Sequence, residues 1–306
     1  MKGRVIQSTG KWYTVQIDSG DEILSSLPGK FRMNDYDRTN PIAVGDWVEV
    51  DLLDDGSGRI SEIHERTNAV MREATHGKRG SQMIAANVDL AVVVQSLLEP
   101  EFKPGFTDRF LVTCEAYGIT PLIIINKTDL AGKNAKAYLD DTIELYRSIG
   151  YDILPCSVKN PELIDAVREH ISGNTCVFIG PSGVGKSSIL NAIDPEAGQS
   201  IGQISEWSKK GKHTTTYAKL VPLNCGGSIV DTPGIREFGL FDIEPEEIDQ
   251  CFPEFEPFRN DCRFNNCLHI DEPGCKVTEA FDNGIISATR YRSYINIVDS
   301  LRNPTR

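Results

Sequence analysis

Short apolar runs alternate with helical patterns through the middle of the chain. Residues 88–95, 121–126, 153–156, 175–179 and 228–231 are strand-length and largely apolar, as buried strands of a parallel sheet are. Between them, residues 107–117, 134–149 and 187–193 have helical character, and Gly118 and Gly150 end the first two. Pro161 after Asn160 suits the start of another helix. The pattern predicts a doubly wound α/β domain over residues 87–241.

A different pattern precedes this domain. Residues 4–6, 12–17, 22–24 and 46–51 read as short strands, and glycine-containing turns separate them. About five short strands within residues 1–66 predict a small all-β barrel. We favour an OB-fold, with an SH3-like barrel or a simple meander as the alternatives.

Two further segments complete the predicted organisation. Residues 67–86 carry Arg72, Lys78 and Arg79 without clear periodicity, which indicates a basic linker. Residues 242–306 contain acidic turns, a cluster of cysteines and a histidine, and an amphipathic helix over residues 285–301. The last segment is therefore expected to be a small helical domain.

Composition is that of a globular chain. Of its 306 residues, 40% are hydrophobic and 25% charged, and the net charge is −12. An acidic chain is a poor promiscuous binder of nucleic acid, although a local basic patch could still meet RNA. The first residues lack the apolar run of a secretory leader, and no apolar stretch approaches the roughly 20 residues that span a bilayer. We expect a cytoplasmic monomer without a membrane partner.

A glycine-rich loop follows the apolar strand at residues 175–179 and opens a helix. It matches the phosphate-binding loop pattern at every required position and comprises Gly180, Pro181, Ser182, Gly183, Val184, Gly185, Lys186 and Ser187, with Ser188 next. The loop's backbone amides would surround the phosphates. Lys186 is expected to reach the β- and γ-phosphates, and the Ser187 hydroxyl to bind Mg²⁺.

A second phosphate-site motif ends the last apolar strand. Asp231 is placed to hold Mg²⁺, and the Gly234 backbone amide to meet the γ-phosphate, since glycine has no side chain to block the approach. An Asp-x-x-Gly pattern alone is weak evidence for a phosphate site. Its position on a strand after a phosphate-binding lysine makes it strong.

Base recognition is predicted for the end of the strand at residues 121–126. There the chain reads Asn126, Lys127, Thr128 and Asp129. The Asp129 carboxylate can accept from the N1–H and amino group of guanine, which adenine does not offer as a pair, so the nucleotide is GTP or GDP. Ser157, after the next strand, is a candidate backbone contact to the base; an ordinary turn is the alternative.

The order of these motifs differs from that of an ordinary small GTPase. The base-recognition motif and Ser157 come before the phosphate loop, and Asp231 comes last, which predicts a circularly permuted domain. Thr214, Thr215 and Thr216 lie where the γ-phosphate is sensed, and we favour Thr215 as the one that contacts Mg²⁺. Ile235 replaces the usual water-orienting glutamine. His213 is the candidate substitute, an exposed loop histidine being the alternative.

Four residues near the C-terminal end have the spacing of a zinc site. Cys262, Cys267, His269 and Cys275 offer three thiolates and one imidazole, a full tetrahedral set with no position open for catalysis. Disulfides would leave one cysteine over and ignore His269. A single structural Zn²⁺ is therefore predicted.

The combination of permuted GTPase motifs, an N-terminal barrel and this cysteine–histidine spacing resembles the ribosome small-subunit-dependent GTPase A family over essentially the whole chain. Gly211-Lys-His-Thr-Thr and Asp231-Thr-Pro-Gly-Ile match the family's pattern as well. The resemblance implies a GTPase stimulated by the 30S subunit that acts late in its maturation and contacts 16S rRNA. A GTP-dependent binding scaffold, or a permuted GTPase for a non-ribosomal partner, are the alternatives.

Overall fold

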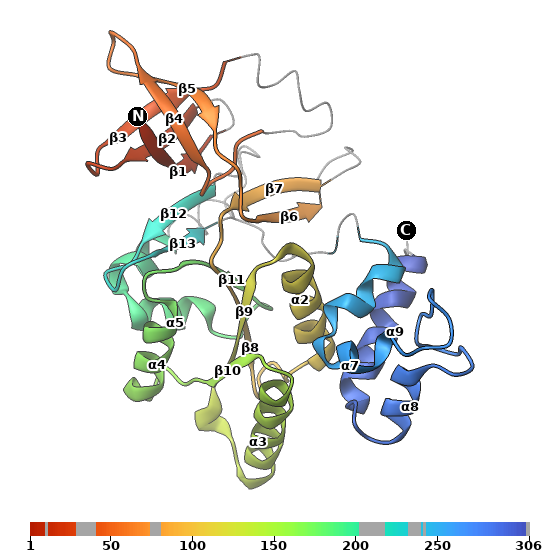
Figure 1. The fold of residues 1–306 in the computed structure, drawn as a ribbon. Coiled ribbons are helices and arrows are strands. Elements are labelled where there is room, and N and C mark those ends of the chain that lie inside the picture. The colour runs from red at the N-terminus through yellow and green to blue at the C-terminus, as the bar shows by residue number, and fades with distance from the viewer. Residues whose placement is uncertain are drawn as a thin grey trace.

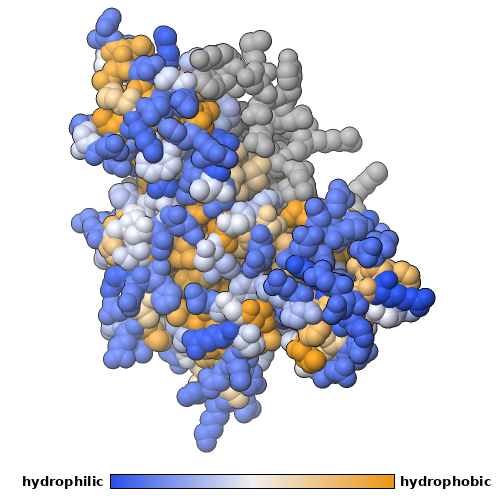
Figure 2. Space-filling view, in the orientation of Figure 1, coloured by the Kyte–Doolittle hydropathy of each residue, from blue (hydrophilic) through white to orange (hydrophobic). Residues whose placement is uncertain are grey.

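Three connected units make up the structure. The computed structural model describes residues 1–9, 12–28, 41–73, 81–201, 218–231, 240 and 243–303. Figure 1 shows a small barrel at the N-terminal end, a central sheet with helices, and a helical unit beside α2 (Pro104–Tyr117). Polar residues cover most of the face in Figure 2, with small apolar patches between them. Within these ranges, no helix has the length and apolar character needed to cross a bilayer.

Five strands form the N-terminal barrel: β1 (Lys2–Ser8), β2 (Trp12–Ile17), β3 (Glu22–Ser26), β4 (Trp47–Leu52) and β5 (Gly58–Ile63). They follow the order β1-β2-β3-β5-β4, and β1 pairs with β4 to close the barrel. Alternate residues such as Val5, Tyr13, Val15, Val48 and Val50 are buried inside it. The order and the closure are those of an OB-fold, as the sequence predicted.

The segment expected to be a linker contains a pair of strands. β6 (Ala69–Glu73) and β7 (Ser81–Ala86) are antiparallel, with an irregularity between Val70 and Met71. The structure therefore differs from the irregular connector that we expected. Val70 and Ala85 are fully buried in the same apolar cluster as Val44. Tertiary packing, rather than alternation in the local sequence, fixes these strands.

The central sheet carries the predicted α/β domain. Its strands are β8 (Leu90–Ser96), β9 (Thr120–Asn126), β10 (Asp152–Pro155), β11 (Thr175–Ile179), β12 (Ala218–Pro222) and β13 (Ser228–Asp231). They lie in the order β10-β9-β8-β11-β13-β12. β12 is antiparallel to β13, and the other neighbours are parallel.

Helices cover both faces of this sheet. α2 and α3 (Lys133–Ser148) cover one face, and α4 (Pro161–Ile171) and α5 (Lys186–Ile193) cover the other. Successive strand residues point to opposite faces: Val93 belongs to the first apolar cluster and Val92 to the second. Both are fully buried. This doubly wound arrangement is the predicted one.

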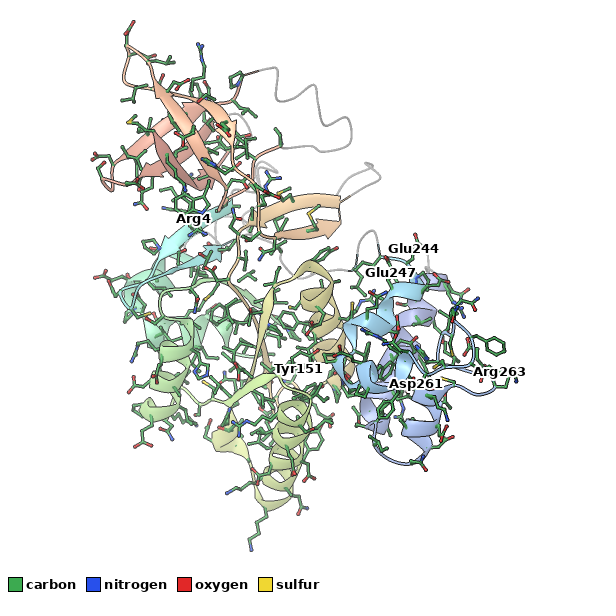
Figure 3. The ribbon with its side chains drawn as sticks, viewed as in Figure 1. Arg4, Tyr151, Glu244, Glu247, Asp261 and Arg263 are labelled. Atoms are coloured by element: carbon green, nitrogen blue, oxygen red, sulfur yellow. The ribbon has the colours of Figure 1, made fainter. Side chains whose placement is uncertain are left out.

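A short strand pairing joins the barrel to the central sheet. Gln7 and Ser8 of β1 lie opposite Lys219 and Ala218 of β12, which makes one continuous sheet of 11 strands. Arg4, labelled in Figure 3 at the base of the barrel, donates from Nη2 to the Asn87 carbonyl at 3.1 Å. Backbone pairing and side-chain contacts therefore both fix the barrel on the central domain.

The C-terminal unit packs around aromatic residues. Its elements are η2 (Pro245–Cys251), η3 (Pro253–Phe255), α7 (Glu256–Arg259), α8 (Lys276–Asp282) and α9 (Ala288–Arg302). Phe252 and Tyr294 are fully buried and meet edge to face, with ring centroids 5.2 Å apart. This unit contains the predicted C-terminal helix, which begins three residues later than residue 285.

A buried ion pair attaches this unit to the central domain. Arg290 of α9 donates to Asp108 of α2 at 2.8 Å, and both side chains are fully buried. Arg290 also donates to Glu254 at 2.7 and 3.2 Å, and the Tyr146 hydroxyl donates to Asp108 at 2.8 Å. Burial alone lowers the pKa of Arg290, but the Asp108 and Glu254 carboxylates outweigh it and raise this pKa. The guanidinium therefore stays charged.

Candidate nucleotide and metal sites

The glycine-rich loop lies where phosphates would be bound, between β11 and α5. Gly180 and Gly185 have φ of 149° and 97°, in the region that favours glycine. A Cβ at Gly180 would lie 2.1 Å from the Val94 carbonyl oxygen, and one at Gly185 would lie 2.4 Å from Asn126 Nδ2. Both glycines are therefore required by conformation and by space.

Lys186 and Ser187 open α5 directly after this loop. Lys186 Nζ donates to the Gly180 carbonyl at 2.6 Å and the Pro181 carbonyl at 2.9 Å, so its ammonium lies over the loop. Ser187 and Ser188 are exposed in the first turn. Backbone amides at a helix N-terminus, together with a lysine, suit an anionic phosphate chain. The sequence-predicted loop residues thus form one continuous segment that curls around the Lys186 ammonium.

Asn126 connects the base-recognition motif to the phosphate loop. Its side chain is almost fully buried, and Nδ2 donates to the Val184 carbonyl at 2.8 Å. Lys127 has a positive φ of 61°, and its ammonium donates to the Glu99 carbonyl. The Thr128 hydroxyl donates to the Cys156 carbonyl at 3.0 Å. The Asn126 bond holds the two motifs, which are far apart in sequence, in one site, and the other two bonds attach the base-recognition motif to the segments after β8 and β10.

The Asp129 carboxylate is held at the end of this motif by two donors. The Ser157 hydroxyl donates to Oδ1 and Lys159 Nζ to Oδ2, each at 2.7 Å. The hydrogen bonds from Lys159 and then Ser157 lower the pKa of Asp129. The carboxylate therefore remains an ionised acceptor, the form that guanine's donors require.

Lys159 was absent from the sequence-predicted site. Ser157 was considered only for a backbone contact, whereas its hydroxyl orients Asp129. The available indication was a lysine two residues after Ser157, at the end of the strand beside β9.

Asp231 lies at the end of β13 with a buried oxygen that lacks a partner. Its Oδ2 is one of four buried side-chain atoms, among the described residues, without a hydrogen bond. Burial raises the pKa of Asp231 to about 6. An unpaired buried carboxylate is costly unless it meets a cation, so this position fits Mg²⁺. Gly234, Ile235, His213, Thr214, Thr215 and Thr216 lie outside the described residues.

The predicted metal ligands converge in the C-terminal unit. The ligand atoms of Cys262, Cys267, His269 and Cys275 all lie within 4.8 Å of one another. All eight cysteines are free, so no disulfide competes for these thiols. Cys262 and Cys275 have their sulfurs 3.9 Å apart, and His269 Nδ1 lies 3.5 and 3.4 Å from these two sulfurs. Bonds of about 2.3 Å to sulfur and about 2.0 Å to nitrogen, arranged tetrahedrally, need separations of roughly 3.8 and 3.5 Å. The donor set therefore fits one tetrahedral metal ion.

Backbone amides support two of these thiolates. Lys276 N–H donates to Cys262 Sγ and Thr278 N–H to Cys275 Sγ, each at 3.3 Å. Burial raises the pKa of Cys275, but its hydrogen bonds, that from Thr278 foremost, outweigh burial and lower it to about 7. A thiol that ionises easily is a ready metal ligand.

Comparison with known proteins places this combination of sites in a family. The RsgA GTPase family matches residues 63–241, and the family of RsgA N-terminal domains matches residues 2–60. The chain belongs to the RsgA GTPase family. A small ribosomal subunit biogenesis GTPase RsgA of Phocaeicola vulgatus is 41% identical, over 98% of this chain and 96% of that protein. One from Azobacteroides pseudotrichonymphae is 43% identical, over 98% and 97%.

Solved structures agree with this assignment. YjeQ from Thermotoga maritima has a TM-score of 0.81 and 34% identity, and the similarity covers 100% of this chain and 99% of that one. YloQ, described as a circularly permuted GTPase, has a TM-score of 0.77 and 31% identity, covering 100% and 96%. The predicted permutation of this RsgA-family chain is therefore confirmed, and the chain is a GTPase.

The permutation is visible in the order of the strands. β8, β9 and β10 come first in the chain, yet β11, which leads into the phosphate loop, lies at the centre of the domain between β8 and β13. The loops after β9, β11 and β13 all leave the carboxyl ends of parallel strands, where ligands bind in open α/β sheets. Changing the point at which the chain starts therefore leaves the ligand-binding edge of the sheet intact.

Proposed function

We propose that this chain hydrolyses GTP while bound to the small ribosomal subunit and so serves a step in the assembly of that subunit. The contact between Asn126 and Val184 is the observation that supports it most, because it joins guanine recognition to the phosphate loop. The names of the relatives supply the ribosomal partner. We further propose 16S rRNA as the surface that is met, a monomeric state and a cytoplasmic location.

In this proposal, the nucleotide is held from both ends. Asp129 accepts from the guanine edge, and Lys186 and the loop amides bind the phosphates. Ser187 and Asp231 hold Mg²⁺ together with Thr215, and the Gly234 amide meets the γ-phosphate. Bound Mg²⁺ supplies charge neutralisation during phosphoryl transfer. His213 orients the attacking water, since Ile235 has no polar group to do so.

We also propose that the C-terminal metal is one structural Zn²⁺. Three thiolates and one imidazole are soft ligands that favour zinc over Mg²⁺ or Ca²⁺. Four such ligands would complete a tetrahedron around the ion and would leave no open position for a reacting water. Metal analysis of the purified full chain should find one zinc per molecule.

GTP turnover with and without purified 30S subunits tests the proposal. We expect slow turnover alone and clear stimulation by 30S subunits, whereas 50S subunits serve as the control and should stimulate little. His213→Ala should lose most of the stimulated rate and keep nucleotide affinity. Turnover that 30S and 50S subunits change equally would contradict the ribosomal assignment, although not the GTPase itself. Full stimulation of His213→Ala would move the water-orienting role to another group.

A further inference from the structure

Asp249 lies beside the cluster of four predicted metal ligands but is not one of them. It projects from η2, and its Oδ2 lies 3.5 Å from His269 Nε2. The other ring nitrogen, Nδ1, faces the sulfurs of Cys262 and Cys275 at 3.5 and 3.4 Å. The two nitrogens of one imidazole therefore meet two different kinds of partner.

We propose that Asp249 is a positioning residue of the metal site: it accepts a hydrogen bond from His269 Nε2–H and thereby fixes Nδ1 as the ligating nitrogen. This inference rests on the proposed metal. A neutral imidazole carries one proton, and the nitrogen without it must face the metal. Carboxylates beside metal-bound histidines commonly select the tautomer and ring orientation in this way.

The backbone of His269 is already fixed by contacts that do not involve Asp249. Its φ is +57°, and its carbonyl accepts from the Tyr291 hydroxyl of α9 at 2.6 Å. The preceding Leu268 carbonyl accepts from the Tyr294 hydroxyl at 2.7 Å, and the Glu272 carboxylate accepts from Leu268 N–H at 2.9 Å. These bonds place the Cα and Cβ of His269, but they do not determine which ring edge faces the thiolates.

Aromatic packing restrains the plane of the ring without choosing its edge. Phe255 meets the imidazole edge to face at 6.1 Å, and Tyr294 lies 6.4 Å away. A half-turn about the Cβ–Cγ bond would leave this packing nearly unchanged, because it exchanges ring atoms of similar size. Only polar partners distinguish the two orientations, and Asp249 and the thiolates are such partners on opposite sides.

The backbone that carries Asp249 is itself held in place. Glu244 N–H donates to Glu247 Oε2 at 3.0 Å at the start of η2, and Figure 3 labels both residues there. The Asp249 carbonyl accepts from Phe252 N–H at 3.3 Å and from Arg259 Nη1 at 3.5 Å. Its side chain is only 16% exposed. Asp249 is therefore presented to the ring by a separate, fixed element.

Charge alone would not favour a carboxylate here. Zn²⁺ with three thiolates and a neutral imidazole has a net charge of about −1, so a nearby anion repels the centre. A hydrogen bond from Nε2–H offsets that repulsion, because the metal makes this proton a better donor. The two explanations differ in sign: repulsion predicts that removing Asp249 strengthens zinc binding, and positioning predicts that removal weakens it.

Zinc affinity of the full chain, measured by competition with a chromophoric zinc chelator, distinguishes repulsion from positioning. We expect Asp249→Ala to bind Zn²⁺ roughly 10- to 100-fold more weakly than wild type, as loss of such a partner does elsewhere. Asp249→Asn keeps an oxygen acceptor and should lie between the two. Glu246→Ala, an exposed residue of the same element, is the matched control and should bind as wild type does.

A second measurement does not depend on any variant. In the wild-type zinc protein labelled with ¹⁵N-histidine, long-range ¹H–¹⁵N correlations should show the His269 proton on Nε2 and the metal on Nδ1. A proton on Nδ1 would overturn the inference, as would zinc binding by Asp249→Ala equal to or tighter than wild type. Asparagine has nearly the size of aspartate, so an Asn variant as weak as the Ala variant would assign the loss to the missing carboxylate rather than to packing and would support the inference. Wild-type protein without stoichiometric zinc would instead refute the proposed metal.

Discussion

Replacing Arg290 by methionine should loosen the C-terminal unit from the central domain. Methionine retains much of the apolar stem but removes the donors that meet Asp108 at 2.8 Å and Glu254 at 2.7 and 3.2 Å. Asp108 is fully buried, and its Oδ2 already lacks a hydrogen-bond partner. The variant would leave two carboxylates with little exposure and without their cation.

The expected cost follows from that uncompensated charge. Removing one partner of a buried ion pair typically costs about 3–5 kcal/mol. Arg290 also lies over the rings of Phe252 at 4.5 Å and Tyr151 at 5.8 Å, the latter labelled in Figure 3, so some packing is lost as well. At about 1.4 kcal/mol per factor of ten, the opening equilibrium should rise at least ~100-fold.

Native-state hydrogen exchange of the α9 amides measures this opening locally, which suits a chain of several domains. Arg292→Met is the matched control, because Arg292 is an exposed residue of the same helix and should change stability by less than about 0.5 kcal/mol. Tyr146→Phe removes one hydrogen bond to Asp108 and should cost about 1 kcal/mol. If the α9 amides of Arg290→Met are protected from exchange to within tenfold of wild type, the reasoning is refuted.

Three further outcomes concern the nucleotide site. Asp129→Asn should weaken GDP by about 10- to 150-fold, the equivalent of ~1.5–3 kcal/mol, and favour xanthosine diphosphate in competition binding; unchanged GDP affinity would contradict the base pocket. Lys186→Ala should abolish GTP hydrolysis and leave the circular dichroism spectrum near native, so retained turnover would place the active site elsewhere. Because burial raises the pKa of Asp231 to about 6, Mg²⁺-dependent GDP affinity should rise about tenfold per pH unit up to pH 6 and then level off. Asp231→Asn should lose this pH dependence, and a persistent slope would assign it to another group.

The predicted elements were those with a clear local pattern. Residues 175–179 and 228–231 coincide with β11 and β13, since continuous apolar runs are buried on both faces of a parallel sheet. β12 was not predicted, because Lys219 and Pro222 interrupt its apolar residues. β6 and β7 were missed for the related reason that their burial depends on residues distant in sequence.

In the candidate sites too, residues in local motifs could be predicted, and residues brought in by tertiary contacts could not. Motif spacing identified the residues that the structure brings together around the phosphate loop, Asp129 and the cysteine cluster, and their roles stay predictions. The roles of Lys159 and Asp249 and the pairing of Arg290 with Asp108 depend on tertiary contacts between elements, which the motifs do not contain. For Lys159 alone, its position two residues after Ser157 gave a local indication.

The pairing of β1 with β12 has a consequence for folding during protein synthesis. Ser8 pairs with Ala218, which leaves the ribosome about 210 residues later. At about 5–20 residues per second, β1 waits roughly 10–40 s for this partner, while the barrel's own strands are complete far earlier. During that interval part of β1 is an open edge, the kind of surface on which nascent chains associate. We expect chains truncated before residue 218 to keep this edge open and to aggregate more readily than the full chain.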